Sequence, residues 1–393
     1  MAKRANGEGY IYKKRKHYEA RITKGYNSNG NQLFKYFSGK TKTEVVAKLD
    51  KYKAEKSNGT YIEDKKITVG QWLDEFYSTH IVNRVTLSTQ VNDESIIKHH
   101  LKPFIGRIKL FDLKGRSVQQ MYNQMLIDGR VDRKGGLNPK TVRNIHITLH
   151  KALEQAVKDD LIIKNPLKSV TLPRMKKKEI QILTPEEQKK LNHACLEHPW
   201  GIVVLLTLYS GMRKGEVLGL TWNNIDFDNK RLYVTQQLTR IKDYRKDATA
   251  KTMLGIIDDT KTKTSKRIIY IAPVIMEELK KHKEKQNKER LKWNDAYKDL
   301  NMVFCREDGQ YIDPGTFRDF YLRTLKKAQI APKTFHALRH TFATRALEIN
   351  SNIKTVSEIL GHASIQITLD TYSHVSKDLQ EDTMQKMVEN FYL

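Results

Sequence analysis

The C-terminal half of this 393-residue chain holds six side chains whose types and order suit chemistry on a phosphate group. A guanidinium binds two oxygens of an anion at once, a lysine or histidine moves protons, and a tyrosine hydroxyl can act as a nucleophile when its neighbours activate it. The sequence has no acidic cluster of the kind that holds two magnesium ions, so cationic side chains would have to stabilise the transition state. The candidate catalytic residues are Arg213, Lys261, His336, Arg339, His362 and Tyr372.

Arg213 lies in the segment Ser210–Glu216, which follows an apolar stretch with helical periodicity. Glycines on both sides of it allow the backbone to turn tightly beside the core. Glu216 stands three residues after Arg213, so we expect its carboxylate to hold the guanidinium in a bidentate pair while the remaining donors face an oxyanion. Taken alone, the motif is more typical of a surface ion pair.

Lys261 belongs to the basic segment Thr260–Arg267, which leads into a predicted strand at 268–271. Two aspartates precede it, so we expect a β-hairpin with lysines at its tip. A flexible lysine there can reach a phosphate and donate a proton. Lys263 is two residues away and strand alternation places both lysines on one face, so the choice between them stays open. A solvated turn is the other interpretation of this segment.

A predicted helix carries His336 and Arg339, which are three residues apart and share one face. His336 and His340 have the i, i+4 spacing of a zinc pair. However, Ala337 replaces the glutamate of the H-E-x-x-H motif, and no compact set of further ligands accompanies the two histidines. We therefore expect neither a metal nor another cofactor.

His362 follows a predicted short helix that Gly361 caps, and Tyr372 comes ten residues later among polar neighbours. A lone tyrosine is usually structural, but polar surroundings suit a hydroxyl that a substrate must reach. With Arg213 and Arg339 clamping the non-bridging oxygens of a phosphodiester, Tyr372 would be the nucleophile. Its free pKa near 10 leaves about one molecule in a thousand ionised at neutral pH, so neighbouring groups must activate it.

These residues and their flanks resemble those of the tyrosine recombinases, in particular the integrases of phages and conjugative transposons. The family pattern Arg…Lys…His-x-x-Arg…His/Trp…Tyr is matched in order over about 160 residues. The motif Gly-x-Arg-x-x-Glu matches Gly211–Glu216, and Leu-Gly-His matches Leu360–His362. The spacing from His362 to Tyr372 is also typical of the family.

The resemblance implies a cycle of DNA cleavage and rejoining that needs neither ATP nor a metal. Tyr372 would attack the scissile phosphate, forming a 3′-phosphotyrosyl link and freeing a 5′-hydroxyl, and Lys261 would protonate the leaving oxygen. His336 would assist proton transfer at the tyrosine, and His362 would hydrogen-bond the phosphate. Two rounds on paired duplexes, through a Holliday junction, would exchange strands. The expected function is site-specific integration and excision of a mobile element.

The charge of the chain independently favours nucleic acid as the partner. The sequence has 71 Lys and Arg against 45 Asp and Glu, a formal net charge of +26, and such an excess attracts polyanions. No helix with a clean basic face and a clean apolar face supports a membrane-surface protein, and the longest apolar stretch, 200–209, is too short to span a bilayer. Two cysteines exclude a disulfide scaffold. We expect a protein of the bacterial cytoplasm, associated with the nucleoid.

Residues 1–60 are predicted to form a small arm-type DNA-binding domain. They carry 15 Lys and Arg against 5 Asp and Glu. Three short strands with turns between them precede a helix that begins near Lys42. A sheet of this kind can enter a DNA groove, whereas the plainer interpretation is a solvated basic face. The expected DNA contacts are Tyr10, Tyr12, Arg21, Lys35 and Tyr36.

Residues 66–168 show four apolar stripes with helical spacing, which predicts a compact helical bundle that binds the core site. The catalytic domain is expected over 180–393, mainly helical with a small antiparallel sheet. It opens at Thr184–Glu187 with a capping box and a proline at the first helical position. The fold class is therefore α+β with several domains. The basic linker before the catalytic domain is also expected to contact DNA, through Arg174, Lys176, Lys177 and Lys178.

The resemblance also implies partners. The first domain would bind arm sites of double-stranded DNA, and the bundle and the catalytic domain would close around the core site as a clamp. Four protomers would assemble on DNA, with an excisionase and DNA-bending proteins as accessory partners. The tail at 375–393 has apolar residues at near-helical spacing, and it would dock either on a neighbouring protomer or on its own domain.

Two other functions agree with parts of the pattern. A type IB topoisomerase-like enzyme that relaxes supercoils would share the nucleophile and most of the pocket. A non-catalytic basic DNA-binding protein would not need Tyr372 at all. The arm-like first domain and the tail favour recombination over relaxation, and the ordered set of six residues favours an enzyme.

Overall fold

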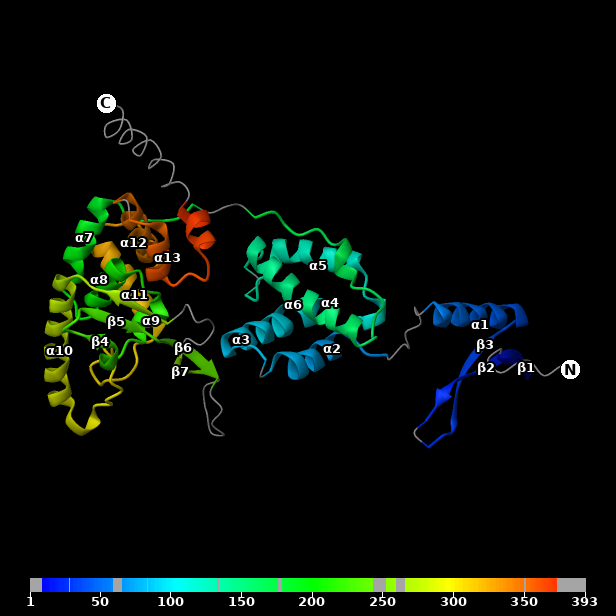
Figure 1. The fold of residues 1–393 in the computed structure, drawn as a ribbon. Coiled ribbons are helices and arrows are strands. Elements are labelled where there is room, and N and C mark those ends of the chain that lie inside the picture. Colours follow the sequence, from blue (N-terminus) through cyan, green and yellow to red (C-terminus); the bar gives the residue numbers. More distant parts are fainter. Residues whose placement is uncertain are drawn as a thin grey trace, which may run out of the picture. The chain divides into compact units, whose positions relative to one another are not determined.

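The chain consists of two compact units, residues 1–176 and 177–393, drawn in Figure 1. The structure is a computed structural model. It describes residues 9–27, 29–58, 66–82, 84–132, 134–175, 179–242, 252–258, 266–349 and 351–372.

The first unit begins with a three-stranded antiparallel sheet in the order β1-β2-β3, followed by helix α1. Alternate residues of the central strand, Ala20 and Ile22, are buried against Val45, Leu49 and Tyr52 of the helix. One face of the sheet is therefore covered by α1, and no helix formed by the described residues of this module lies on the other (Figure 1). The bounds are Tyr10–Lys14 for β1, His17–Tyr26 for β2, Gln32–Gly39 for β3 and Lys42–Ser57 for α1.

A helical bundle follows in the same unit, and its core contains residues of all four predicted stripes, although Phe104 of the second stripe is exposed. The indole nitrogen of Trp72 donates a hydrogen bond to the carbonyl of Ala152 at 2.9 Å, which ties the first helix of the bundle to the last. The helices are α2 (Val69–Phe76), α3 (Leu87–Ile96), α4 (Lys102–Ile105), α5 (Gly115–Asp128) and α6 (Pro139–Lys158), with π-helical turns at Tyr77–Ile81 and Ile97–Leu101.

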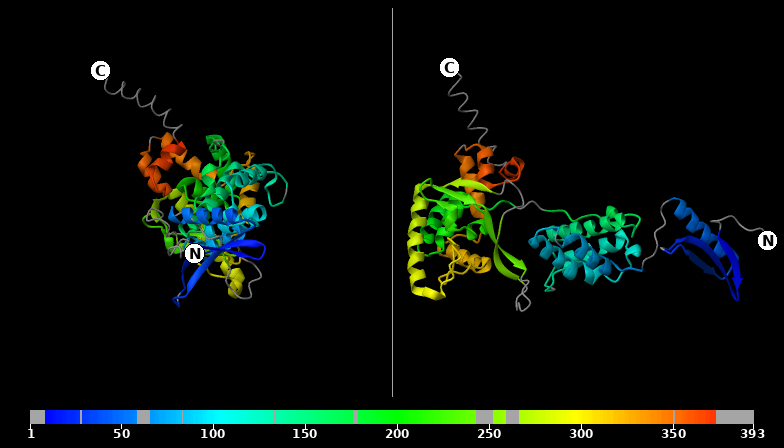
Figure 2. Two further views of the ribbon diagram at one scale, coloured as in Figure 1. Left: turned by 90° about the vertical axis from the view of Figure 1, so that its right-hand side faces the viewer. Right: turned by 60° about the horizontal axis from the view of Figure 1, so that its bottom comes forward.

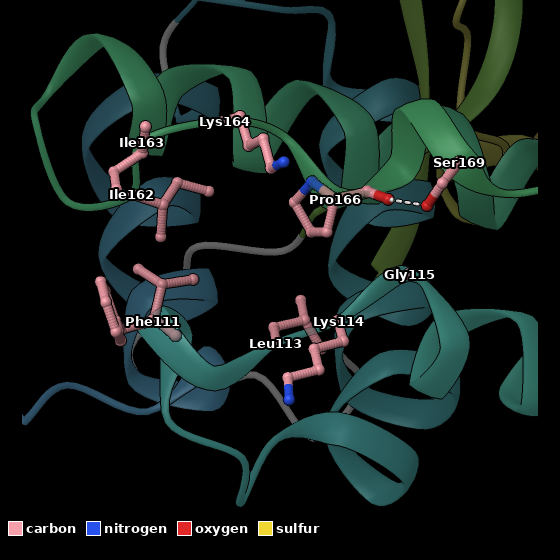
Figure 3. A pocket seen from close by; sticks show the side chains of 10 residues that line it. Phe111, Leu113, Lys114, Gly115, Ile162, Ile163, Lys164, Pro166 and Ser169 are labelled. Atoms are coloured by element: carbon pink, nitrogen blue, oxygen red, sulfur yellow. Dashed lines mark hydrogen bonds between the residues drawn. The ribbon is translucent and has the colours of Figure 1, made fainter. Parts of the chain in front are cut away.

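A hollow of about 300 Å³ opens on this bundle, as Figure 3 shows. Phe111, Leu113, Ile162 and Ile163 give it a mainly apolar lining. The hydroxyl of Ser169 at its edge donates to a backbone carbonyl rather than facing a ligand. The hollow therefore offers no group suited to phosphate chemistry apart from two lysines, and none of the candidate catalytic residues that the structure describes lines it.

The second unit is built around α8, a helix that is apolar on all sides and almost wholly buried. Such a helix belongs in the centre of a domain, with other helices packed around it. The N-terminus of α7 has the predicted capping box, since the side chains of Thr184 and Glu187 each accept a hydrogen bond from the other residue's backbone nitrogen. The helices are α7 (Pro185–Cys195), α8 (Gly201–Ser210), α9 (Lys214–Leu218), α10 (Pro273–Trp293), α11 (Pro314–Lys327), α12 (His336–Glu348) and α13 (Ile353–Leu360).

The strands of this unit form two separate small sheets. One has the order β4-β5-β8, and the other is the β6–β7 hairpin, which extends from the body of the unit (Figures 1 and 2). The expected hairpin around Lys261 is therefore wrong, because the strand before it pairs with β6 and the strand after it pairs with β5. The bounds are β4 Ile225–Asp226, β5 Arg231–Val234, β6 Gln236–Lys242, β7 Thr252–Asp258 and β8 Arg267–Tyr270.

Among the described residues, no helix is both long and apolar enough to cross a lipid bilayer.

Candidate active site

Arg339 lies where two helices of the second unit end. Its guanidinium donates one hydrogen bond to the carbonyl of Gly211, after α8, at 2.8 Å and one to the carbonyl of Leu360, the last residue of α13, at 2.7 Å. Carbonyls at helix C-termini carry partial negative charge and lack partners within the helix, so a cation is a natural ligand for them. Only 2% of Arg339 is exposed, and burial lowers its pKa to about 9. It stays protonated at neutral pH.

The guanidinium of Arg213 is held by the end of α13, which also holds Arg339. Its guanidinium donates to the carbonyl of Gly361, the residue after Leu360, at 2.9 Å. Gly211 and Gly361 both have left-handed backbones, with φ of 66° and 64°, a conformation that glycine adopts without steric cost. The end of α13 therefore presents the neighbouring carbonyls of Leu360 and Gly361 to the two arginines, while Gly211 serves Arg339 alone, and two positive side chains converge on one place.

Glu216 lies between Arg213 and a third arginine that the sequence reading did not single out, Arg267 of β8. Arg213 donates to one carboxylate oxygen at 2.7 Å through its side chain and to the other at 2.8 Å through its backbone nitrogen. Arg267 makes the two-pronged contact with both oxygens, at 3.2 and 2.7 Å. The expected contact between Glu216 and the guanidinium of Arg213 is present, but its bidentate geometry is wrong, because the two-pronged contact belongs to Arg267.

The buried carboxylate of Glu216 is ionised. Burial opposes its ionisation, but the hydrogen bonds and charges of Arg267 and Arg213 outweigh it and lower the pKa of Glu216 to about 2. Arg267 also donates through Nε to the carbonyl of Ile359 in α13 at 2.6 Å. One carboxylate and one arginine thus connect the start of α9, strand β8 and the end of α13. Arg213 projects from this frame with about a third of its side chain exposed.

Tyr372 lies in a helical segment, 365–372, after α13. It is 2% exposed, and its ring belongs to an apolar cluster with Leu347, Val356 and Leu360. Its hydroxyl lies 2.8 Å from Nδ1 of His340. Burial raises the pKa of Tyr372 to about 12, although the charge of Arg339 acts in the opposite direction.

The two predicted histidines have different surroundings. His336 is exposed, and crowding by protein atoms together with the charges of Arg339 and Arg213 lowers its pKa. His362 is half-buried, and its Nδ1 lies 2.8 Å from the hydroxyl of Thr368. Burial, followed by the charges of Arg339 and Arg213, lowers the pKa of His362 to about 4. The ring of His362 is therefore neutral at pH 7.

Five of the six candidate catalytic residues are among the residues that the structure describes, and they lie on or beside α9, α12 and α13 of the second unit. Lys261 and its alternative Lys263 lie outside the described residues. Among the residues that the structure describes, there is no group of three histidine, cysteine or acidic side chains that could hold a metal ion.

The candidate DNA contacts of the N-terminal sheet divide between its two faces. Strand pairing places Tyr10 and Tyr36 directly opposite Arg21, and directly opposed residues share a face. Tyr12 stacks on Tyr10 with ring centroids 5.8 Å apart, so four of the candidates lie on the face without the helix. Lys35 does not: it pairs with buried Ile22 and approaches the ring of Tyr52 in α1, 5.0 Å from its centroid.

The linker candidates can be placed only in part. Arg174 is exposed, and Lys176, Lys177 and Lys178 lie outside the described residues, as does the tail at 375–393.

The chain matches two protein-family models over parts of its length, and it matches one curated protein over its full length. The model described as "Phage integrase family" matches residues 181–378, and the model described as "Phage integrase, N-terminal SAM-like domain" matches residues 68–126. A protein named "Tyrosine recombinase XerC-like" from Caldanaerobacter subterraneus is 30% identical over 403 residues, which cover 100% of each chain.

Two solved structures have a similar fold. The integrase of transposon Tn1549, in complex with transposon right end DNA, gives a TM-score of 0.67 at 22% identity and covers 82% of this chain and 100% of its own. A lambda integrase tetramer bound to a Holliday junction gives a TM-score of 0.53 at 17% identity and covers 94% of this chain and 96% of its own.

Proposed function

Because the chain belongs to the phage integrase family of tyrosine recombinases, which are DNA strand-transferring enzymes, we propose that it integrates and excises a mobile element by site-specific recombination. The observation that carries this proposal is the pair of arginines fixed by the adjacent carbonyls of Leu360 and Gly361. Two guanidinium groups held side by side repel each other, and an anion placed between them relieves that repulsion. A phosphodiester has two non-bridging oxygens on which both can act.

The proposed reaction is an exchange of phosphate esters that conserves the bond energy. The phenolic oxygen of Tyr372 attacks the scissile phosphorus, a new P–O bond forms, and the bond to the 5′-oxygen breaks. The tyrosine loses a proton, and the leaving 5′-oxygen gains one. We assign the second proton to Lys261 and assistance with the first to exposed His336. In the rejoining step, a 5′-hydroxyl attacks the phosphotyrosine and the same proton transfers run in reverse.

His362 fits the role of a neutral hydrogen-bond donor to the phosphate. If the hydroxyl of Thr368 donates to Nδ1 of this ring, the single proton of the neutral imidazole is on Nε2. That N–H can donate to a non-bridging oxygen without adding charge to a site that already has two arginines.

We further propose that the domains of the chain bind different parts of the DNA substrate. Residues 1–60 bind arm sites, 66–168 and 180–393 form the clamp around the core site, and the tail docks between protomers. A tetramer on two duplexes follows from the need for four cleavages, and excisionase and DNA-bending proteins would bias its direction. Chromosomal DNA as the target would place the enzyme with the nucleoid of a bacterial cell.

The direct test is covalent trapping by the full-length protein. Because the attachment site is unidentified, the probe is a library of nicked duplexes with a randomised central segment, in which cleavage releases a short fragment and prevents rejoining. We expect wild-type protein to form covalent complexes with particular sequences from the library. Mass spectrometry should then identify Tyr372 as the residue to which the DNA is attached. The variant Tyr372→Phe should bind the selected duplex without trapping it. Covalent complexes of equal yield with Tyr372→Phe would refute the proposal, and site-independent relaxation of a plain plasmid would favour a topoisomerase.

A further inference from the structure

We propose that His340, a residue outside the six-membered set, positions the nucleophile: its Nδ1 accepts the hydrogen bond of the Tyr372 hydroxyl and holds the phenolic oxygen in place for attack. The two atoms are 2.8 Å apart, and the two rings meet edge to face with centroids 5.9 Å apart. This inference rests on the proposed function, because it gives Tyr372 the role of nucleophile.

Helix α12 explains how one short stretch can serve both the phosphate and the nucleophile. Successive residues of a helix point about 100° apart, since there are 3.6 residues per turn. Arg339 therefore points to the carbonyls at the ends of α8 and α13, whereas the next residue, His340, points to Tyr372. His336, one turn earlier, packs its ring edge-on against that of His340 at 4.6 Å. The orientation of His340 is thus restricted from both sides.

The surroundings of Tyr372 divide its positioning between two kinds of contact. The ring is packed among aliphatic side chains of α12 and α13, which fix its plane. Packing of this kind does not determine where the hydroxyl proton points, and a buried hydroxyl without a partner costs free energy. His340 supplies that partner and so determines the direction of the O–H bond.

His340 acts here by position rather than as a strong base. Burial, with the neighbouring His336 and Arg339, lowers the pKa of His340 to about 4, while the pKa of Tyr372 is raised to about 12. A ring that is so weakly basic cannot take the phenolic proton at equilibrium, but it is neutral at pH 7 and free to accept a hydrogen bond at Nδ1 with its own proton on Nε2. Proton removal then depends on the bound phosphate and on other groups.

The test compares two substitutions in the full-length protein. In His340→Asn, the side-chain oxygen of the amide lies close to the position of Nδ1 and can accept the same hydrogen bond, whereas the side chain of His340→Leu has similar bulk and no acceptor. The measurements are the single-turnover rate of covalent complex formation on the selected nicked duplex, and the Kd for that duplex. We expect His340→Leu to slow trapping by about 10- to 100-fold with Kd unchanged within about twofold. His340→Asn should recover most of the rate.

Equal and full loss of trapping in both variants, or a wild-type rate in His340→Leu, would overturn the positioning role. Failure of the proposed function would give a different result. In that case wild-type protein would trap no duplex from the library, or Tyr372→Phe would trap the duplex as well as wild-type protein does.

A second measurement does not depend on whether His340→Leu folds. In protein labelled with ¹⁵N-histidine, the Nδ1 resonance of His340 reports whether this nitrogen accepts a hydrogen bond. Tyr372→Phe removes only the hydroxyl, so the resonance should move to the position of an unbonded imidazole nitrogen in that variant. Coincident Nδ1 resonances in wild-type and Tyr372→Phe protein would contradict the proposal.

Discussion

Arg267 holds both carboxylate oxygens of Glu216, and this pair is almost completely excluded from solvent, with 6% of the arginine side chain and none of the glutamate side chain exposed. The contact has the fork geometry that makes arginine–carboxylate pairs strong. Because Arg213 uses the same carboxylate, the position of Arg213, which contacts the phosphate in the proposed mechanism, depends on Arg267, which has no role there.

Glu216→Gln should destabilise the second unit and slow cleavage. The substitution keeps the size of the side chain but leaves two guanidinium groups without their shared counter-charge, and breaking a buried pair from one side typically costs about 3–5 kcal/mol. Denaturant unfolding would measure the loss. Glu278→Gln is a matched control, since Glu278 forms an exposed pair with Lys281. A loss no greater than that of Glu278→Gln would show that the buried pair does not stabilise the fold.

The stabilisation by Glu216 should disappear in acid. Its pKa is lowered from an ordinary value of 4.5 to about 2 in the folded protein. A carboxyl whose pKa is lowered by folding contributes stability that is fully present above the unfolded value and is lost as the pH falls through the folded value. The difference in free energy of unfolding between wild-type protein and Glu216→Gln should therefore be constant from pH 7 to about 5 and shrink steadily from pH 4.5 towards 2. A difference that stays constant down to pH 3 would contradict the assignment.

The sequence was sufficient for the parts of the site that depend on local pattern. The motif around Arg213, the glycine cap before His362 and the capping box at Thr184 each follow from residues within a few positions of one another. The partners of Glu216 and Tyr372 do not, because Arg267 and His340 are 51 and 32 residues away from them. Periodicity assigns a residue to a face of its own element, and it does not say which distant element that face meets.

The same reasoning explains why the sequence placed Lys35 on the wrong face of the N-terminal sheet. Strand β3 has aromatic residues on both faces, with Phe34 and Tyr36 on one and Phe37 on the other, so no clean alternation of polar and apolar residues marks the face that α1 covers. Only the pairing with β2 shows which face α1 covers, because Lys35 lies opposite buried Ile22.

Arg339→Lys should impair cleavage far more than DNA binding. A lysine keeps the charge, but its single nitrogen cannot hold the carbonyls of Gly211 and Leu360 in the same planar arrangement and still face a phosphate. We expect about a 100-fold slower formation of the covalent complex, as for the loss of a donor that stabilises a transition-state oxyanion, with less than about threefold change in Kd. Filter binding and single-turnover trapping on the same duplex would measure both. Parallel losses of rate and affinity would argue against a role in the transition state.

Gly361→Ala tests whether the glycine cap positions Arg213. A methyl group at this left-handed position costs about 1–2 kcal/mol in backbone strain, and the added carbon would lie 3.0 Å from Nη1 of Arg267. The carbonyl that holds Arg213 should shift, and trapping should fall by more than the loss of stability explains. Gly30→Ala is the matched control, because Gly30 is also left-handed, with φ of 77°, but has open space around it. Equal effects of the two substitutions on trapping would show that the glycine cap at Gly361 does not position Arg213.

The N-terminal sheet should bind DNA through the face that α1 leaves uncovered. Arg21 lies on that face and Lys35 on the other, so Arg21→Ala and Lys35→Ala remove one positive charge each from opposite sides of the same small sheet. If charge alone mattered, the two variants would bind equally. We expect Arg21→Ala to weaken binding of the full-length protein to arm-site DNA by about tenfold, and to reduce the slope of log affinity against log salt by about one phosphate contact, because a direct contact releases a counterion. Lys35→Ala should change affinity by less than about threefold. A larger effect of Lys35→Ala in a folded protein would place the DNA on the side of the helix.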